Sequence, residues 1–423
     1  MVPEAQAAEN ECSLMRICLI VSSDVITDSR VMRHARTLGR RGHDVIVLGP
    51  ESEETVFGKE TEYFRIVRVK LRVHERLQRF ANGIKSRHAR ITETRRGPTA
   101  IGATSPVSLL RRLYRRFSDI AILVSHFLDM NMTMAKAGRG LDADIYTSNN
   151  LDVLLAGAIA SSGGEKKYLV YDAHELWTDM SVQMPLRAFF YNLEKALIRK
   201  ADVVMTVNEF IALELARRYH IQTPEVVHNC AERSEIPLNA KHGTKVIALY
   251  HGVFSSDRGL ENLIASSEYL EKDVLLLMRG SGEIKTKLKD LASSRGNCQF
   301  ADPVPPDKVI QRAAEADVGI VPYLPTNLNN YLSSPNKLFE YIQAGIPVVA
   351  SNLPFLSKII HEEDIGLTFN PYDPRDIASA INTVTREREL KRLRQNVRRA
   401  AEKWCWESEE KKLLHIYERL REC

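Results

Sequence analysis

In the stretch SSPNKLFEYIQAGIPVVAS, a predicted helix begins with Asn336, Lys337 and Leu338 and carries Glu340 one turn later. The first turn of a helix presents free N–H groups and partial positive charge, so it binds phosphate, and the Lys337 ammonium would add a cation. Glu340 lies on the same face, where its carboxylate can accept hydrogen bonds from two vicinal hydroxyls, as on a ribose. Ser334 could cap the helix. The pattern predicts a site for a nucleoside diphosphate; the alternative is an ordinary surface pair of Lys337 with Glu340.

Two further loops carry arginines and glycines in the same half of the chain. The loop HGVFSSDRGLENL contains Arg258, and the loop LMRGSGE contains Arg279 and Gly280. Each loop leaves a predicted strand and enters a predicted helix, which is where an open α/β sheet binds ligands. Because a guanidinium matches phosphate geometry, Arg258 and Arg279 suit a leaving diphosphate. The structural alternative is that the glycines serve only as turn residues.

Apolar runs at regular intervals predict the strands that would position these loops. At 423 residues the chain exceeds what one core usually fills, so we expect two domains of about 200 residues each. Short uncharged runs followed by helical periodicity are typical of parallel strands in βαβ units. The sequence therefore predicts an α/β fold with two doubly wound, Rossmann-like halves joined near residues 229–241. The predicted strands lie at residues 16–21, 44–49, 63–70, 144–149, 168–174, 202–207, 245–254, 274–282, 297–302, 317–323 and 346–351.

The composition is that of an ordinary globular protein, with 44% hydrophobic and 27% charged residues. The six cysteines are scattered without a C-x-x-C pair, which argues against a zinc site and a disulfide framework and favours a reducing cytoplasm. The N-terminus lacks the basic-then-apolar order of a signal peptide, and no apolar run reaches the roughly 18 residues that span a bilayer. We therefore expect a cytoplasmic protein.

The span of residues 65–116 is strongly basic, with 15 Lys and Arg against the two acids Glu75 and Glu93. Basic residues interleaved with Leu, Phe and Tyr can lie on an anionic membrane surface, which would place the protein at the inner face of the membrane. A solvated insertion with a basic helix is the alternative. No recognised nucleic-acid-binding motif accompanies the charge, so no nucleic acid partner is expected.

The C-terminal half resembles the group 1 glycosyltransferases, retaining GT-B enzymes of glycosyltransferase family 4. The matching segments are HGVFSSDRGLENLI, MRGSG, ADVGIVPY and, most specifically, SSPNKLFEYIQAGIPVVAS. In the other half, DSRVMRHARTLGRRGHDVIVLG, TSNNLDVLLAGAIA and YDAHELWTD look like the same family. The resemblance implies a GT-B fold, in which two Rossmann-like domains face each other across a cleft. It assigns residues 1–228 to an acceptor-side domain with a basic insertion at about 71–116, residues 229–401 to a nucleotide-sugar-binding domain and residues 402–423 to a closing helix.

The resemblance also assigns roles to single residues. Glu340 matches the second glutamate of the family's E-x7-E motif, which binds the nucleotide ribose, and Arg258 matches the basic position of the phosphate-binding loop. His174, in YDAHELW, matches the histidine that faces the donor sugar. The implied catalytic residues are His174, Arg258 and Arg279; those that bind the donor are Glu340, Lys337, Asn336, Leu338, Gly252, Gly280 and Ser334; those on the acceptor side are Asp28, Arg30, Asn150 and Asp152.

The sequence departs from the family pattern at three places. The first glutamate of E-x7-E would fall on Leu332, and a second basic position of the phosphate loop falls on Val253, for which Arg279 could compensate. The first predicted strand is followed by SSDVITDSR and not by the glycine pair that many relatives carry. These departures concern the contacts to the donor sugar and leave the nucleotide site complete.

The resemblance implies transfer of a sugar from a UDP- or GDP-sugar to a glycan, a lipid-linked or a small-molecule acceptor, with no other cofactor. Arg258, Arg279 and the helix start would stabilise the leaving diphosphate, whose oxygen would take the acceptor's proton, giving retention. The D-x-D pair Asp142 and Asp144 is typical of metal-using transferases of another fold, but it precedes a predicted strand inside a matching segment, so no metal is expected. The rivals are a GT-B nucleotide-sugar epimerase, an NAD-dependent oxidoreductase, which the missing G-x-G-x-x-G disfavours, and a non-catalytic scaffold.

Overall fold

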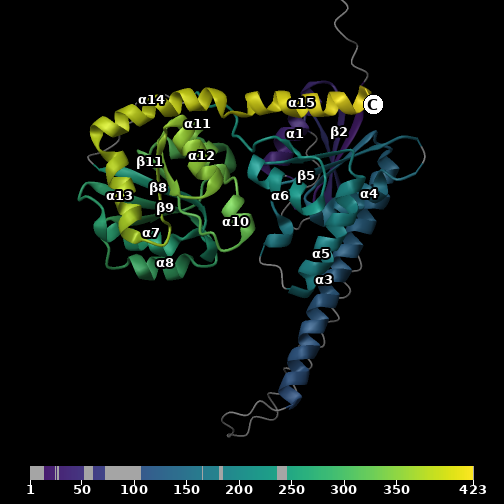
Figure 1. The fold of residues 1–423 in the computed structure, drawn as a ribbon, viewed down its shortest axis with the longest axis horizontal. Coiled ribbons are helices and arrows are strands. Elements are labelled where there is room, and N and C mark those ends of the chain that lie inside the picture. The colour runs from purple at the N-terminus through teal and green to yellow at the C-terminus, as the bar shows by residue number, and fades with distance from the viewer. Residues whose placement is uncertain are drawn as a thin grey trace, which may run out of the picture. The chain divides into compact units, whose positions relative to one another are not determined.

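The computed structural model describes residues 14–23, 25, 28–51, 61–71, 106–163, 165–180, 184–235 and 245–422 (Figure 1). Most of the predicted basic insertion, residues 72–105, lies outside these ranges. The chain divides into two compact units, one of Met1–His174 and Gln183–Val204 and the other of Glu175–Val182 and Met205–Cys423. Among the helices in the described ranges, none is both long and apolar enough to cross a membrane.

Each half of the chain builds a parallel sheet. In the described residues the first sheet has seven strands in the order β3-β2-β1-β4-β5-β6-β7, and the second has six in the order β10-β9-β8-β11-β12-β13. The second order is that of a dinucleotide-binding Rossmann sheet, and the first contains the same order with one strand added. The strands of the first sheet are β1 Arg16–Ile20, β2 Asp44–Pro50, β3 Arg65–Val69, β4 Ile145–Asn149, β5 Tyr168–Ala173, β6 Val203–Thr206 and β7 Glu225–Val226. Those of the second are β8 Val246–Val253, β9 Val274–Ser281, β10 Cys298–Ala301, β11 Val318–Val321, β12 Val348–Ser351 and β13 Gly366–Phe369.

Helices form where the apolar residues repeat every three or four positions. In α1, Asp28 accepts a hydrogen bond from the Val31 amide at 3.2 Å and so caps the helix, while Gly42 takes the left-handed φ of 91° just after its end. In Figure 1 the N-terminal part of the long helix α3 extends well past α4 and α5. The helices before residue 205 are α1 Ser29–Arg40, α3 Pro106–Leu141, α4 Leu154–Ala160 and α5 Met184–Leu197.

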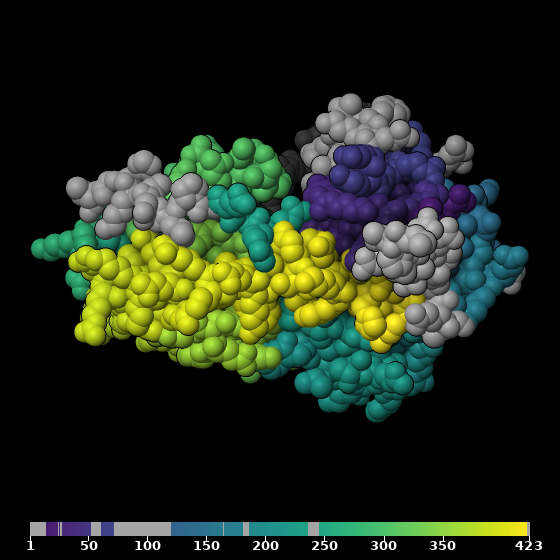
Figure 2. Space-filling model, turned by 90° about the horizontal axis from the view of Figure 1, so that it is seen from above, coloured from purple at the N-terminus to yellow at the C-terminus, as the bar shows by residue number. Residues whose placement is uncertain are grey.

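In the second unit, helices cover both faces of the sheet (Figure 1). Leu249 packs with α11 and α12 on one face, and its neighbour Ala248 packs with α7, α8 and α13 on the other, because successive strand residues point to opposite sides. Helices α14 and α15 form a continuous band on the surface (Figure 2). The helices are α6 Glu209–Tyr219, α7 Leu260–Ser266, α8 Lys285–Ala292, α9 Val309–Ala313, α10 Leu328–Leu332, α11 Asn336–Gln343, α12 Pro354–Glu363, α13 Pro374–Thr385, α14 Glu387–Lys403 and α15 Trp406–Glu422.

The strand predictions are confirmed. Each of the eleven predicted strands overlaps an observed one, and the predicted α/β fold with two Rossmann-like sheets is correct. The sequence analysis missed β7 and β13, which have two and four residues, because runs this short carry little periodicity. Helix α15 lies where the closing helix was expected.

Candidate functional site

In the second sheet the strand order reverses between β8 and β11, which are neighbours. The carboxyl ends of such a pair form the position at which open α/β sheets bind ligands. The loop after β8 leads into the short helix η5 (Ser256–Arg258), and the loop after β11 contains Tyr323. Three side chains meet here, those of Arg258, Tyr323 and Lys337.

Lys337 is a buried cation at this position, with only 9% of the residue exposed. Its Nζ lies 5.1 Å from the Tyr323 ring centroid and 5.2 Å from that of Tyr250, and 3.5 Å from the Tyr323 hydroxyl. Gly252 has a φ of 127°, which favours glycine, and a Cβ there would lie 3.0 Å from Nζ, so a larger residue would displace the ammonium. Among the described residues, no carboxylate lies within ion-pair distance of Lys337.

The charge on Lys337 is retained despite burial. Burial lowers the pKa of this ammonium, but Tyr323, Tyr250 and Glu340 raise it by more, so the net pKa lies above the usual value for lysine. A protonated lysine in a low-dielectric position without a carboxylate partner interacts strongly with any anion that reaches it. The site therefore favours a negatively charged ligand.

Arg258 supplies the second cation. Its guanidinium carbon lies 4.0 Å from the Tyr323 ring centroid, and Nη1 lies 3.4 Å from the Asp257 carboxylate. One tyrosine ring therefore contacts both Arg258 and Lys337, which brings two like charges together. Like charges repel, so this arrangement is most stable when a ligand with more than one negative charge lies between them.

The start of α11 differs from the predicted helix start in two respects. The N-cap residue is Pro335, and Ser334 makes no capping bond, so the prediction that Ser334 caps the helix is wrong. The Leu338 amide donates to the Pro335 carbonyl at 3.1 Å, which leaves the amides of Asn336 and Lys337 for a ligand. The Asn336 side chain accepts a hydrogen bond from Asn229 at 2.7 Å. In the described part of the chain, the buried Ser334 hydroxyl has no hydrogen-bonding partner.

Glu340 lies one turn into α11, with 26% of its side chain exposed. Its Oε2 is 3.3 Å from Nε2 of His251, a residue near the end of β8. Burial, together with the charges of Lys337 and Arg279, lowers the pKa of His251 to about 3, so this imidazole is neutral. A neutral His251 does not neutralise the Glu340 carboxylate.

Arg279 and Gly280 have partners within the fold. Nη1 of Arg279 donates to the Arg312 carbonyl at 2.8 Å, and Nη2 lies 3.8 Å from Glu315. A Cβ on Gly280 would lie 1.9 Å from the Gly252 carbonyl oxygen, so close strand packing already explains this glycine. The geometry therefore gives the predicted roles of Arg279 and Gly280 less support than those of Arg258 and Lys337.

In the first unit, His174 follows β5 and lies beside a buried ion pair. Asp172 accepts two hydrogen bonds from Arg30, both of 2.8 Å, and its Oδ2 lies 3.3 Å from His174 Nε2. The Asn150 side chain accepts a hydrogen bond from the His174 amide at 3.0 Å. Arg30 and Asn150, predicted on the acceptor side, are thus joined to His174.

The other two residues predicted on the acceptor side, Asp28 and Asp152, also accept hydrogen bonds within the first unit. Asp28 caps α1, and Asp152 accepts a hydrogen bond from the Ser22 hydroxyl at 2.5 Å. The D-x-D pair lies at the amino end of β4, where Asp142 pairs with Lys167 and Asp144 accepts from the Arg16 amide at 2.6 Å. This is the edge of the sheet opposite to the one at which such folds bind ligands.

The sequence analysis assigned no binding or positioning role to Tyr323, Tyr250, His251 and Asp172. Tyr250 lies inside β8 and Tyr323 follows β11, and an aromatic residue in or beside an apolar strand is usually part of the core. The signal for Tyr323 was only its place after a strand end. Leu332 and Val253, which stand where the family usually has a glutamate and a basic residue, have ordinary positions. Leu332 is 9% exposed in α10, and Val253 is 64% exposed at the end of β8.

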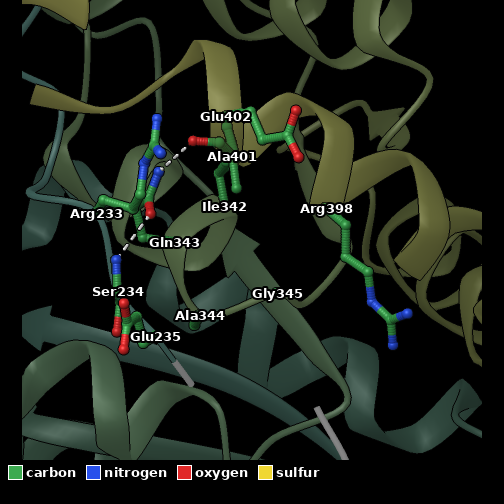
Figure 3. Close-up of a pocket in the computed structure, with 10 residues that line it drawn as sticks. All are labelled: Arg233, Ser234, Glu235, Ile342, Gln343, Ala344, Gly345, Arg398, Ala401 and Glu402. Atoms are coloured by element: carbon green, nitrogen blue, oxygen red, sulfur yellow. Dashed lines mark hydrogen bonds between the residues drawn. The ribbon is translucent and has the colours of Figure 1, made fainter. Parts of the chain in front are cut away.

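A pocket of about 270 Å³ lies at the other end of α11 (Figure 3). Gln343 forms one wall and donates hydrogen bonds to the carbonyls of Ala401 and Trp404 at 2.8 and 2.9 Å. Acidic and basic side chains both line this pocket, so no single ligand charge is favoured. The lining residues are Arg233, Ser234, Glu235, Ile342, Gln343, Ala344, Gly345, Arg398, Ala401 and Glu402.

Two family models match the chain over adjoining segments. The model described as "Glycosyl transferases group 1" matches residues 232–404, and that described as "Glycosyltransferase Family 4" matches residues 28–235. The chain is therefore a glycosyltransferase. Both models describe glycosyl-transferring enzymes, and the segments that they match include Lys337, Glu340, Arg258 and His174.

The relatives agree with this assignment. An uncharacterized glycosyltransferase of Methanocaldococcus jannaschii is 26% identical over 243 residues, which are 51% of this chain and 59% of that protein. Sucrose-phosphate synthase from Thermosynechococcus elongatus superposes with a TM-score of 0.69 at 15% identity, over 96% of this chain and 99% of that one. Anabaena HepE in complex with UDP and glucose superposes with a TM-score of 0.64 at 13% identity, over 97% and 100%. These structural likenesses establish the GT-B fold of this glycosyltransferase.

Proposed function

We propose that this glycosyltransferase moves a sugar from a nucleoside diphosphate sugar to an acceptor hydroxyl, with retention of configuration. The observation that carries the proposal is the pair of cations, Lys337 and Arg258, held on the one ring of Tyr323 at 5.1 and 4.0 Å. In this proposal they bind the diphosphate together with the first amides of α11, while Glu340 binds the ribose hydroxyls.

The proposed mechanism depends on stabilising the leaving group. The bond between the sugar C1 and the β-phosphate oxygen breaks, and negative charge develops on the diphosphate beside Lys337 and Arg258. The acceptor oxygen forms the new bond to C1 from the same face, and its proton passes to the departing phosphate oxygen. Arg279 would contribute as a more distant positive charge. No protein nucleophile is needed for this route.

For the donor, we propose a UDP-sugar first and a GDP-sugar second. The support is that HepE was solved in complex with UDP and with UDP-glucose, and it shares the fold. Both nucleotides belong in the test. The family models give the epimerase alternative no support.

For the acceptor, we propose a glycan or a lipid-linked saccharide used in polysaccharide synthesis at the cytoplasmic face of a membrane. The support is helix α3, on which Leu123, Leu128 and Met132 are 43%, 44% and 55% exposed. The basic sequence RRLYRRF precedes these residues in the same helix. Exposed apolar side chains in a helix whose sequence also carries basic residues suit peripheral contact with anionic lipid.

A donor panel tests the proposal. UDP-glucose, UDP-galactose, UDP-N-acetylglucosamine, GDP-mannose and the free nucleotides are added to the protein, and thermal unfolding is followed. A bound donor raises the unfolding temperature with concentration, because ligand binding stabilises the folded state. Release of UDP or GDP from the stabilising donor in the presence of acceptor extracts supports the transferase. Conversion of the donor to an epimer without acceptor, or no stabilisation by any nucleotide sugar, would contradict it.

A further inference from the structure

We propose that Arg30, Asp172 and Asn150 position His174 so that its Nε2 carries the proton and its Nδ1 remains open to accept a hydrogen bond from a substrate hydroxyl. The inference about the imidazole concerns the first unit alone. Its catalytic part, which identifies the hydroxyl as one on the sugar donor or the acceptor, rests on the proposed function.

The ion pair beneath His174 is closed to solvent. Arg30 is 1% exposed and Asp172 is 0% exposed. Nε of Arg30 donates to Oδ2 of Asp172 and Nη2 donates to Oδ1, each at 2.8 Å, which is the bidentate geometry that holds a carboxylate in one orientation. Oδ2 also lies 3.3 Å from His174 Nε2 and 3.6 Å from His34 Nδ1. One oriented carboxylate oxygen therefore faces the His174 ring.

The charge state of Asp172 determines where the proton on His174 lies. Burial raises the pKa of the Asp172 carboxyl, but Arg30 and His174 lower it by more, so its pKa is far below the usual range and the group is a carboxylate. Burial and Arg30 lower the pKa of His34, so that ring is neutral. A carboxylate can only accept a hydrogen bond. His174 Nε2 lies 3.3 Å from Oδ2, close to the carboxylate but outside hydrogen-bond geometry. In the proposal this buried nitrogen carries the hydrogen, so the lone pair of a neutral ring lies on Nδ1.

The backbone of His174 is fixed as well. Asn150 has a φ of 75°, which is unusual for a residue other than glycine, and its amide donates to the Asp172 carbonyl at 2.9 Å. In this conformation its side-chain oxygen accepts the hydrogen bond from the His174 amide at 3.0 Å. Backbone strain of this kind persists where the surrounding structure requires it and is concentrated at functional sites. The backbone and the ring of His174 are thus both oriented.

One side of the His174 ring remains available. The side chain is 15% exposed, and among the described residues no group hydrogen-bonds to its Nδ1. A ring whose Nε2 faces the Asp172 carboxylate and whose Nδ1 is open can orient a hydroxyl by accepting its hydrogen. In glycosyl transfer this fixes a sugar or acceptor hydroxyl, and it supplies no proton to the leaving group. Arg30 and Asn150, which the sequence placed on the acceptor side, become positioning residues for His174.

The tautomer of His174 is the direct test. Protein labelled with ¹⁵N-histidine is examined at about pH 8 by two-bond ¹H–¹⁵N correlation spectroscopy, which separates protonated from unprotonated ring nitrogens, and a His174→Gln variant assigns the signal. We expect the Nε2–H form in the full chain and a mixture of both tautomers in Asp172→Asn. If Asp172→Asn does not fold, Asn150→Gly replaces it, because glycine accepts a φ of 75°; this variant should broaden the His174 signals. Asp202→Asn is the matched control, since Asp202 accepts from the Leu169 amide at the other end of β5.

Turnover then tests the role of the open Nδ1. With UDP-glucose as probe, Asp172→Asn should lower kcat about 100-fold with little change in KM, because misplacing a contact by about 1 Å costs that much. Asp202→Asn should match the unmodified enzyme. A His174 found with its hydrogen on Nδ1, or a tautomer unchanged in both variants, would overturn the positioning inference. If UDP-glucose is not consumed but the Nε2–H form depends on Asp172, the proposed function fails while the positioning stands.

Discussion

The two sheets share one strand order, but the charged groups near the carboxyl ends of their strands are balanced differently. In the first unit the buried charges neutralise each other, since Arg30 and Asp172 form a bidentate pair with both side chains at most 2% exposed. In the second, Lys337 is buried on two tyrosine rings with Arg258 nearby, and no carboxylate of the described residues forms an ion pair with it.

This difference separates a positioning network from a binding site. A buried pair of opposite charges is neutralised within the folded protein and holds its neighbours in place. A buried cation that shares an aromatic ring with a second cation is neutralised only when an anion binds. Binding of the anion then offsets the free-energy cost of burying the cation.

Arg30→Met should destabilise the protein by about 3–5 kcal/mol, because it leaves the Asp172 carboxylate buried without its partner. Urea unfolding, followed by circular dichroism, measures the change in the free energy of unfolding. Arg217→Met, which removes an exposed partner of Glu214, serves as control and should change the free energy by less than about 1 kcal/mol. If Arg30→Met lowers the free energy of unfolding no more than the control does, Arg30 and Asp172 do not form a buried ion pair.

Lys337→Met should affect activity and not stability, the opposite of Arg30→Met. It should lower kcat/KM for the donor by about 10²–10³-fold, the usual effect of removing a group that stabilises charge in the transition state. The free energy of unfolding should stay unchanged or rise, because a buried charge is replaced by an apolar side chain of similar length. Lys391→Met, on the exposed surface of α14, should alter neither quantity. Destabilisation by several kcal/mol without loss of turnover would contradict the contrast.

Glu340→Gln should weaken UDP binding by about 1.5–3 kcal/mol, the range for a hydrogen bond to a charged group. The expected loss is specific to the ribose. The unmodified enzyme should bind UDP more tightly than 2′-deoxy-UDP, and the variant should bind the two alike, as measured by calorimetry. A variant that weakens UDP but preserves the preference for the ribose would assign the ribose to another residue.

Tyr323→Leu should weaken UDP binding by about 0.5–2 kcal/mol, because the two cations lose the aromatic ring that holds them. Tyr323→Phe keeps the ring and removes only the hydroxyl that lies 3.5 Å from Lys337 Nζ, so it should stay close to the unmodified affinity. The two variants are compared by calorimetry with UDP. Equal losses in both would mean that the hydroxyl, and not the ring, holds the cations.

Two buried histidines, His228 and His34, should contribute to the free energy of unfolding with opposite dependences on pH. Burial lowers the pKa of His228, but Glu209 and Glu409 raise it by more, so its contribution is present below the unfolded pKa of about 6.5 and is lost as the pH rises through the folded pKa. Burial and Arg30 lower the pKa of His34, so its contribution is present above about 6.5 and is lost as the pH falls.

Unfolding free energies at about pH 5.5 and pH 8.5 check these signs. His228→Gln should cost more at the lower pH and His34→Gln more at the higher, by up to about 1.4 kcal/mol for each pH unit that separates the two pKa values. The same sign for both variants would contradict the assigned charge states of the two histidines.

The sequence predicted the fold and singled out Lys337 and Glu340 because both signals are local. Uninterrupted apolar runs define the strands, and Lys337 and Glu340 lie within one turn of the same helix. The partners of His174 could not be predicted in this way, since Arg30 and Asp172 are 142 residues apart and nothing in either local pattern indicates the other.

Other errors of the prediction have a similar cause. Tyr323 was part of a predicted strand, but its contacts are with Arg258 and Lys337, which come from two other elements. The predicted cap at Ser334 was wrong because Pro335, with a ψ of 130°, takes the N-cap position itself and the helix starts one residue later.

The most direct test of the central claim is calorimetric titration of the unmodified enzyme and of Lys337→Met with UDP and with uridine, repeated with GDP and guanosine. If Lys337 and Arg258 bind a diphosphate, the unmodified enzyme should prefer one of the two nucleotides over its nucleoside by at least about 100-fold, or about 2.7 kcal/mol, and Lys337→Met should lose most of that preference. Equal affinity for nucleotide and nucleoside, or a preference that survives in Lys337→Met, would show that the diphosphate binds elsewhere.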